Sequence, residues 1–264
     1  MKIDNQRIWI TGASSGIGAE LVQQTAGKAT LIIISGRDRK KLEILKNSLD
    51  ISKTEIFVLP FNLEDEQAVE EAAKTVIDNF NGVDILINNG GISQRGWVTE
   101  TKEIVDKTIM QINFFSQVKL TKMMLPAMIA QEYGHIVVTS SIVGKFGFPL
   151  RSAYAASKHA LHGFFETLGL ELASSGIKST IICPGRVKTN ISLNALNAEG
   201  KTYGKMDRGQ AEGMSAARCA RKYISAIEKN QWEAYIGNKE ILMIWLKRYM
   251  PGIFRKIAMK ISNK

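Results

Sequence analysis

The sequence has few cysteines and no long hydrophobic run. Cys183 and Cys219 are the only cysteines among its 264 residues, too few for a disulfide framework, so we expect free thiols in a reducing compartment. No apolar run reaches the roughly 18 residues that a membrane-spanning helix needs. Residues 1–7 lead directly into an apolar stretch without the charged, apolar and small-residue order of a leader, so we expect no signal peptide and a cytoplasmic protein.

Histidines and acidic residues are also scarce. His135, His159 and His162 are the three histidines. His159 and His162 lie on one predicted helix, but the rest of a ligand set is missing, so we expect no metal site. There are 25 acidic against 35 basic residues, but +6 of the net charge of +10 falls in residues 239–264. A basic face spread over the whole protein is therefore not indicated, and we expect no nucleic-acid partner.

Short apolar runs alternate with helical patterns along the chain. We predict strands at residues 7–11, 31–34, 55–60, 84–88, 135–140, 179–183 and 234–236, and helices at 17–27, 39–49, 65–80, 99–131 and 153–174. Runs that are apolar on both faces and separated by helices indicate a parallel sheet covered on both sides. The length and the absence of a linker or repeat predict one α/β domain.

The first predicted strand is followed by a glycine-rich turn, Thr11-Gly-Ala-Ser-Ser-Gly-Ile-Gly18. Glycines permit a tight backbone, and the N-terminus of the following helix offers free N–H groups to an anion. A glycine turn can be only a turn, but its place in the first strand–helix–strand unit predicts binding of dinucleotide phosphates.

The end of the second strand bears on the choice of cofactor. Gly36 stands where an acidic residue would accept hydrogen bonds from the ribose diol of NAD. Arg37 follows, and an arginine makes charge-assisted bonds to a 2′-phosphate, so we predict NADP(H) in preference to NAD(H). The alternative is that Arg37 caps the strand end and faces solvent, and the nearby Asp38 keeps NAD(H) open.

Tyr154 and Lys158 are four residues apart in a predicted helix and share one face. A cation about 4 Å from a phenol, at an effective dielectric of about 20, favours phenolate by roughly 4 kcal/mol, or about 3 pKa units. The pair would therefore suit acid–base chemistry near neutral pH. Tyr235 and Lys239 repeat the spacing, so the spacing alone does not choose between the two pairs.

The motifs taken in order resemble the short-chain dehydrogenase/reductase family over residues 7–190. They are Thr11-Gly-x-x-x-Gly-x-Gly18, Asn88-Asn-Gly-Gly91, Ser141, Tyr154-x-x-x-Lys158 and Pro184-Gly185. Gly91-Ile-Ser-Gln-Arg95 and Ala156-Ser-Lys-His-Ala-Leu161 resemble the membrane-associated branch that acts on steroids, retinoids or other lipids. The resemblance implies a doubly wound (Rossmann) parallel sheet and an NAD(P)-dependent oxidoreductase acting on CH–OH and C=O groups.

The resemblance also implies residue roles. Tyr154 would exchange a proton with the substrate, Lys158 would lower its pKa and hold the nicotinamide ribose, Ser141 would hold the substrate oxygen, and Asn113 would hold a water of the proton relay. The implied cofactor-binding residues are Gly12, Ser14, Ser15, Gly16, Ile17, Gly18, Arg37, Asn62, Leu63, Asn89, Gly90, Tyr154, Lys158, Pro184, Gly185, Val187 and Thr189.

Three positions qualify this assignment. Asn62 stands where the family usually has an aspartate against adenine, which implies a weaker contact. Gly90 replaces the commoner alanine, at a modest entropic cost. Thirteen residues before Tyr235 stands Lys222 and no serine, so the second tyrosine–lysine pair lacks the partner that Ser141 provides to Tyr154.

We predict a catalytic domain at residues 1–238, with a substrate loop at about 190–215, and an extension at residues 239–264. The extension is apolar, basic and interrupted by Pro251. Basic amphipathic helices with aromatic residues lie in membrane interfaces, which favours peripheral membrane contact. The alternatives are a flap over the substrate pocket or packing on a partner subunit. The resemblance implies a homodimer or homotetramer.

These observations predict NADPH-dependent hydride transfer between nicotinamide and a carbonyl or secondary alcohol of a hydrophobic substrate. One alternative is a 3-oxoacyl-carrier-protein reductase, because an acidic carrier would suit a basic surface. The other is a non-catalytic dinucleotide-binding regulator.

Overall fold

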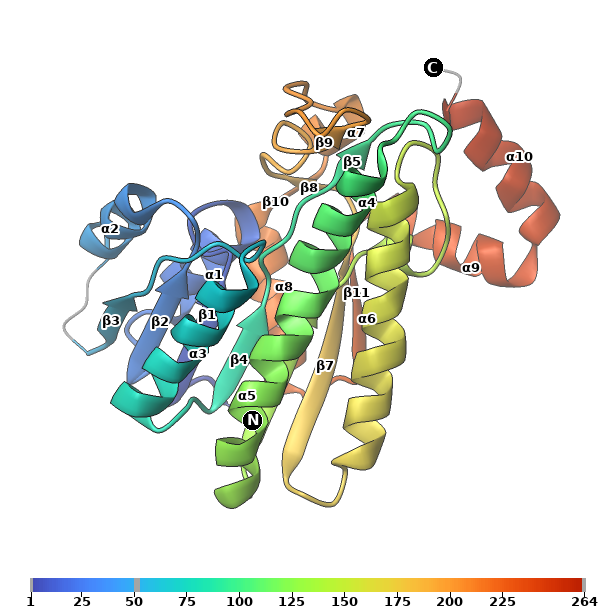
Figure 1. The fold of residues 1–264 in the computed structure, drawn as a ribbon. Coiled ribbons are helices and arrows are strands. Elements are labelled where there is room, and N and C mark those ends of the chain that lie inside the picture. Colours follow the sequence, from blue (N-terminus) through green and yellow to red (C-terminus); the bar gives the residue numbers. More distant parts are fainter. Residues whose placement is uncertain (1, 50–52, 263–264) are drawn as a thin grey trace.

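A parallel sheet forms the centre of the protein. The computed structural model describes residues 2–49 and 53–262, and Figure 1 shows their arrangement. The strand order across the sheet is β11-β7-β6-β4-β1-β2-β3, with every pair parallel. The strands are β1 (Arg7–Thr11), β2 (Leu31–Ser35), β3 (Glu55–Val58), β4 (Ile85–Asn88), β6 (Gly134–Thr139), β7 (Ile177–Pro184) and β11 (Glu233–Ile236). This arrangement confirms the predicted α/β fold.

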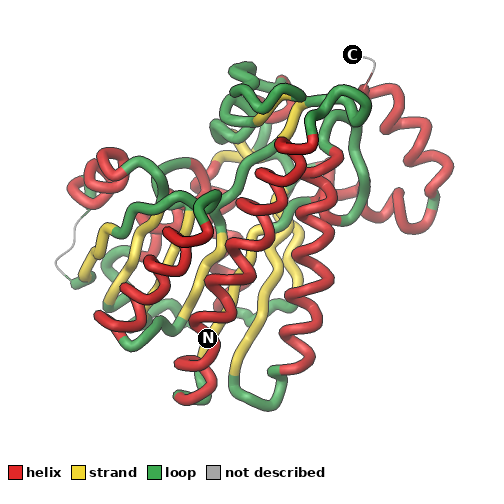
Figure 2. The backbone as a smooth tube through the Cα atoms, viewed as in Figure 1, coloured by secondary structure: helices red, strands yellow, loops and turns green. Residues whose placement is uncertain are grey.

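Helices cover both faces of the sheet, as Figure 2 also shows. One face is covered by α1 (Gly16–Thr25), α2 (Arg39–Asn47) and α8 (Ala216–Glu228), and the other by α3 (Glu66–Phe80), α5 (Ser116–Ala130) and α6 (Ser152–Glu171). Successive strand residues point to opposite faces. Ile8 and Ile10 therefore enter the first core, while Trp9 enters the second, and all three are fully buried. The strands are apolar throughout because each strand contributes side chains to both cores.

The helical region predicted at residues 99–131 has a π-helical turn within it. The chain forms α4 (Glu103–Met110), then the π turn η1 (Gln111–Phe115), and then α5. A π turn adds a residue to one turn of helix and is frequent at functional sites. Asn113 lies in the middle of η1 and is fully buried, so this irregularity fixes the orientation of a residue predicted to be catalytic.

The region after β7 is built from short elements above the carboxyl ends of the strands (Figure 1). The strands β8 (Val187–Lys188) and β9 (Leu196–Asn197) and the short helix α7 (Arg208–Ala211) come before β10 (Met214–Ser215), which leads into α8. The strand β5 (Gln94–Arg95) pairs with β9. Helix α8 was missed by the sequence interpretation, although Cys219, Tyr223 and Ile227 recur at intervals of four and are fully buried.

Three helical segments follow Asn238 in the described part of the chain, and the last two project from the body (Figure 1). They are the 3-10 turn η3 (Lys239–Ile241), α9 (Leu242–Tyr249) and α10 (Pro251–Ser262). Pro251 begins α10, where its missing N–H costs no helical hydrogen bond. The last two residues of the predicted extension lie outside the described residues. Ile244, Phe254 and Ala258 pack with Ile142 and Phe146. Within residues 2–49 and 53–262, no helix has the length and apolar character needed to cross a bilayer.

Candidate active site

A cleft of about 1340 Å³ opens where the strands of the sheet end. In a parallel sheet, loops from neighbouring strands meet at the carboxyl edge, and ligands bind there. Of the predicted site residues, only Gly18 and Asn113 do not line the cleft directly. Those that do are Gly12, Ser14, Ser15, Gly16, Ile17, Arg37, Asn62, Leu63, Asn89, Gly90, Ser141, Tyr154, Lys158, Pro184, Gly185, Val187 and Thr189.

Asn89 fixes the shape of the glycine turn. Its side-chain Nδ2 donates to the carbonyl oxygens of Thr11 at 3.1 Å and Gly12 at 3.4 Å. The Thr11 hydroxyl oxygen accepts from the backbone N–H groups of Asn89 and Gly90, both at 3.0 Å. On the far side, the Thr139 hydroxyl donates to Asn89 Oδ1 at 3.4 Å. The ends of β1, β4 and β6 are thereby held together below the cleft.

The glycine turn suits a diphosphate. Gly12 has φ +66°, and a Cβ atom there would lie 2.7 Å from the Gly90 Cα, so only glycine fits. A Cβ at Gly18 would lie 2.2 Å from the Gly12 oxygen, which explains why Gly18 supports the turn without lining the cleft. Ser15 caps α1 without a side-chain hydrogen bond, and the first turn of α1 holds no acidic residue. The N–H groups of α1 are thus available to an anion.

The residues after β2 are basic and face the same cleft. Arg37 is exposed and lines the cleft together with Lys41. Asp38 caps α2, accepting from the backbone N–H of Lys41 at 3.2 Å and pairing with its ammonium at 3.5 Å. Farther along, Asn62 Oδ1 accepts from the backbone N–H of Glu64 at 3.2 Å, so part of its hydrogen-bonding capacity is already used.

Three of the four residues predicted to be catalytic meet in the cleft, and the fourth lies behind it. Ser141 follows β6, while Tyr154 and Lys158 lie one turn apart on α6, with the Lys158 amine 5.8 Å from the Tyr154 ring centre. The amine donates to the Thr139 carbonyl oxygen at 2.7 Å. Asn113 accepts from the Ile92 N–H and donates to the Ile92 carbonyl oxygen, both at 2.9 Å. The π turn thus ties α5 to the loop after β4.

Burial shifts the pKa values of both Tyr154 and Lys158. Burial raises the pKa of Tyr154 above its ordinary value, while a hydrogen bond with Ser141 and the charges of Arg95 and Arg151 act to lower it. Burial also lowers the pKa of Lys158 to about 7. Both shifts have the same cause, because both groups lose their contact with water. The lowering of the Tyr154 pKa by Lys158 stays a prediction.

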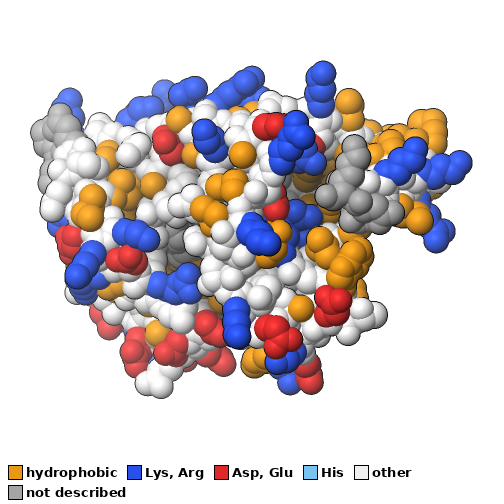
Figure 3. Space-filling model, turned by 90° about the horizontal axis from the view of Figure 1, so that it is seen from above, with side chains coloured by type: hydrophobic (Ala, Val, Ile, Leu, Met, Phe, Trp, Pro, Cys, Tyr) orange, Lys and Arg blue, Asp and Glu red, His pale blue; other side chains and the backbone are white. Residues whose placement is uncertain are grey.

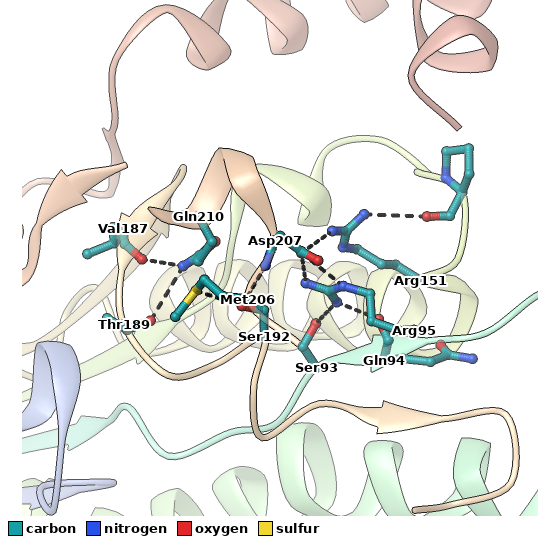
Figure 4. Close-up of polar contacts among 11 residues, drawn as sticks. Ser93, Gln94, Arg95, Arg151, Val187, Thr189, Ser192, Met206, Asp207 and Gln210 are labelled. Carbon is teal, nitrogen blue, oxygen red and sulfur yellow. Dashed lines mark hydrogen bonds and ion pairs between the residues drawn. The ribbon is translucent and has the colours of Figure 1, made fainter. Parts of the chain in front are cut away.

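Arg95, Arg151 and Asp207 form a charged cluster that sequence reasoning did not find. Figure 4 shows the Asp207 carboxylate between the two guanidinium groups. Arg151 Nη2 and Arg95 Nε each donate to Asp207 Oδ2 at 3.0 Å, and all three residues line the cleft. They lie 56 and 112 residues from Asp207 in the chain, so no local spacing could have brought them together.

A second buried cluster lies behind Ser140. Ligand atoms of His162, Cys183 and Glu233 lie within 4.8 Å of one another. The Lys145 ammonium, however, lies 2.7 Å from Glu233 Oε1, and burial raises the pKa of Cys183 well above its ordinary value. A cation already pairs with the carboxylate and the thiol resists deprotonation, so this geometry does not favour a metal. The absence of a metal stays a prediction.

The sequence of most of the cleft-forming region matches a known family. A sequence profile described as short chain dehydrogenase matches residues 6–200. The chain belongs to the short-chain dehydrogenase/reductase family. By this membership it is an NAD(P)-dependent oxidoreductase. The chain is 38% identical to the mouse dehydrogenase/reductase SDR family member 7B over 265 residues, covering 98% of this chain and 82% of the relative. It is 39% identical to the human SDR family member 7, covering 97% and 78%. These relatives confirm the predicted resemblance to the branch of the family that contains the dehydrogenase/reductase SDR members.

Solved structures show the same fold. A short-chain dehydrogenase from Burkholderia phymatum in complex with NAD aligns with a TM-score of 0.83 at 21% identity, covering 96% of each chain. One from Burkholderia cenocepacia in complex with NADP aligns with a TM-score of 0.79 at 20% identity, covering 98% of this chain and 99% of the other. At these identities the likeness concerns the fold alone.

The depressed pKa of Lys158 predicts a stability difference that depends on pH. Between about 7, the folded value, and 10.5, the ordinary value, the unfolded chain holds one proton more on this lysine. The contribution of Lys158 to the free energy of unfolding therefore rises with pH over this window, by at most about 1.4 kcal/mol per pH unit. Urea denaturation of the wild type and Lys158→Met from pH 7 to 10 measures the difference between their slopes. The exposed Lys40→Met is the control, and parallel curves for wild type and Lys158→Met would contradict the assignment.

Proposed function

We propose that the protein is an NADPH-dependent oxidoreductase that transfers hydride between nicotinamide and a carbonyl or secondary alcohol of a hydrophobic substrate. The observation that carries the proposal is the meeting of Ser141, Tyr154 and Lys158 in one cleft with the glycine turn. The dinucleotide would supply the hydride. Side chains of this protein would perform the rest of the reaction.

Two hydroxyl groups act on the substrate, one by donating a proton and the other by binding the substrate oxygen. In the reductive direction, Tyr154 gives its proton to the carbonyl oxygen as negative charge develops there. Ser141 donates a hydrogen bond to the same oxygen and stabilises that charge. Lys158 and Asn113 position the tyrosine and the loop after β4, and the buried surroundings exclude water that would screen these interactions.

The substrate end of the cleft supports a hydrophobic substrate. Apolar side chains line it beside the tyrosine and include Ile92, Ile142, Val143, Phe146, Phe148 and Met243. Apolar pockets with a few polar groups are typical of small-molecule sites. The 1340 Å³ cleft would hold both the dinucleotide and an extended apolar chain.

Replacement of the proposed proton donor tests the reaction directly. Tyr154→Phe keeps the ring but removes the transferable proton, so we expect kcat to fall by at least about 100-fold while NADPH still binds. Turnover is followed by NADPH absorbance with a panel of steroids, retinal and 3-oxoacyl thioesters. Tyr235→Phe is the matched control because it changes the other tyrosine–lysine pair. Full turnover by Tyr154→Phe would contradict the role of Tyr154, whereas a wild type that binds NADPH and turns over no substrate would favour the non-catalytic regulator.

The preference for NADPH rests on the basic residues after β2. Gly36 brings no carboxylate, Asp38 is engaged in capping α2, and Arg37 lines the cleft. A guanidinium there would bind a 2′-phosphate by charge-assisted hydrogen bonds.

Arg37→Ala should therefore raise KM for NADPH by about tenfold, the loss of one charge-assisted contact, and leave KM for NADH unchanged. Steady-state kinetics with each cofactor measure the ratio. The neighbouring exposed Arg39, which pairs with Glu43 at 3.6 Å, provides the control Arg39→Ala. An equal rise in both KM values, or a wild type that prefers NADH, would contradict the preference.

The C-terminal helices are proposed to contact a membrane surface. Leu242, Trp245, Tyr249, Ile253 and Ile257 keep between 36% and 69% of their surface exposed. Figure 3 shows hydrophobic side chains together with Lys and Arg on the part of the protein where α9 and α10 project. Apolar and basic groups on one helical unit suit the interface of an anionic bilayer.

Two variants test this contact. Truncation after Asn238 should abolish cosedimentation with vesicles containing anionic lipid, and Lys256→Glu with Lys260→Glu should weaken it by at least about tenfold, since each basic residue contributes about 1 kcal/mol. Both lysines are exposed, so the double variant keeps the fold. Neutral vesicles serve as the comparison, and failure of the full chain to bind anionic vesicles would end the proposal.

A homodimer or homotetramer is also proposed from the resemblance to the family. Its support in this structure is the exposure of Phe115 in η1, Ile129 on α5 and Leu170 on α6, at 46% to 70% of their surface. These helices cover one face of the sheet and could pack against a second copy.

A further inference from the structure

We propose that Gln94 is a positioning residue that caps helix α6 from outside and thereby holds Tyr154 in a fixed relation to the substrate loop. This inference rests on the proposed function, because it concerns the residue that exchanges the proton. It also assigns a role within the motif Gly91-Ile-Ser-Gln-Arg95, none of whose side chains takes part in the proposed reaction.

The helix that carries Tyr154 lacks a cap of its own. A helix leaves its first N–H groups without partners inside the helix, and the side chain of the N-cap residue usually accepts from the second or third of them. The N-cap of α6 is Arg151, which makes no capping bond and whose side chain has no acceptor. Its φ of −138° and ψ of 37° also differ from the extended conformation typical of N-cap residues. The first turn of α6 therefore needs an acceptor from another part of the chain.

Gln94 supplies that acceptor. Its Oε1 accepts from the backbone N–H of Ala153 at 2.9 Å and from that of Tyr154 at 3.4 Å. These are the second and third residues of α6, the two positions that an N-cap side chain would serve. They follow Gln94 by 59 and 60 residues in the chain, so the cap is a long-range contact. One of its two bonds is made by the backbone of the residue that bears the phenol.

The hydrogen bonds allow the Gln94 amide only one orientation. Backbone N–H groups can only donate, so the atom that faces Ala153 and Tyr154 is the amide oxygen. The amide nitrogen donates to the hydroxyl oxygens of Thr101 at 3.1 Å and Ser152 at 3.3 Å. Gln94 is fully buried, and both polar atoms of its side chain have partners. Loss of the oxygen would remove the acceptor that the two N–H groups of α6 share.

The segment that carries Gln94 is bonded to the substrate loop on its other side. Gln94 pairs with Leu196 in β9, and the Ser93 carbonyl oxygen accepts from the Leu196 N–H at 2.9 Å. The neighbouring Arg95 donates to Asp207, farther along the same loop, at 3.0 Å. Figure 4 shows the two side chains leaving β5 in different directions, Arg95 toward Asp207 and Gln94 away from it. One short strand thus joins the substrate loop to the helical turn that bears the proton donor.

The position of this turn bears on the rate of the reaction. The first turn is the least restrained part of a helix, because its N–H groups have no partners within the helix. Proton transfer needs the Tyr154 oxygen within about 2.6–3.2 Å of the substrate oxygen, and a displacement of about 1 Å can cost about 100-fold in rate. The cap therefore affects the proton step and not the binding of the dinucleotide, whose diphosphate would lie at the glycine turn.

Two variants of similar length separate capping from the filling of space. Gln94→Met occupies a similar volume but offers no oxygen, so kcat for carbonyl reduction should fall by at least about tenfold, while Kd for NADPH stays unchanged. Gln94→Glu keeps an oxygen toward the N–H groups, and its charge suits a helix N-terminus, so kcat should stay within about threefold of the wild type. Steady-state kinetics give kcat, and NADPH fluorescence gives Kd and the fraction of chains that bind.

Thr101→Val is the matched control. It removes a partner of the Gln94 nitrogen but leaves the oxygen bonded to α6, so kcat should not change. A wild-type kcat in Gln94→Met would overturn the inference. Equal losses of kcat in Gln94→Met and Gln94→Glu, or in Gln94→Met and Thr101→Val, would also overturn it, because packing of the buried amide would then explain the loss.

A second readout needs no substrate. Hydrogen exchange followed by NMR should be at least about tenfold faster at the Ala153 and Tyr154 amides in Gln94→Met than in the wild type, and unchanged at Phe165 in the middle of α6. Gln94→Asn, whose amide is one methylene shorter, gives the same measurement if Gln94→Met fails to fold. Unchanged exchange at Ala153 and Tyr154 would overturn the inference. Faster exchange there, in a protein that turns over no carbonyl or alcohol, would instead overturn the proposed function and leave the cap by Gln94 standing.

Discussion

The hydrogen bonds of the Asn89 side chain hold the site together, because they join the ends of three strands at one point. The amide donates to the carbonyl oxygens of Thr11 and Gly12, and its oxygen accepts from the Thr139 hydroxyl. The Thr139 carbonyl oxygen in turn accepts from the Lys158 amine. The glycine turn that would hold the dinucleotide and the helix that carries Tyr154 are therefore fixed with respect to each other through a short chain of bonds. Hydride and proton transfer need that fixed relation.

Burial and charge act against each other in the same cleft. Exclusion of water strengthens every electrostatic interaction inside but disfavours both a phenolate and an ammonium. In this chain the balance raises the pKa of Tyr154 and lowers that of Lys158. The cations that remain charged under these conditions are arginines, because a guanidinium keeps its proton at far higher pH than a buried amine. A hydrogen bond with Ser141 acts against burial and lowers the pKa of Tyr154.

Local patterns predicted most of the fold, and long-range contacts were out of their reach. Apolar runs such as Leu31–Ser35 and the glycines after Thr11 identified the sheet and its cleft, since those signals lie within a few residues. The π turn around Asn113 was not predicted within the long helical region, and the two hydrogen bonds between the Asn113 side chain and Ile92 span 21 residues of the chain, beyond any local pattern. Helix α8 carried a readable period of apolar residues and could have been predicted. Asp207 between Arg95 and Arg151 could not, since only the fold brings those three residues together.

A crystal structure with NADPH and a slowly reacting carbonyl substrate tests the central claim most directly. The account predicts the diphosphate at the N-terminus of α1 and the substrate oxygen within about 2.6–3.2 Å of both the Tyr154 and Ser141 hydroxyl oxygens, with the nicotinamide ring against the carbonyl carbon. A dinucleotide bound at the glycine turn with its nicotinamide directed away from Tyr154, or a substrate oxygen held by other residues, would contradict it.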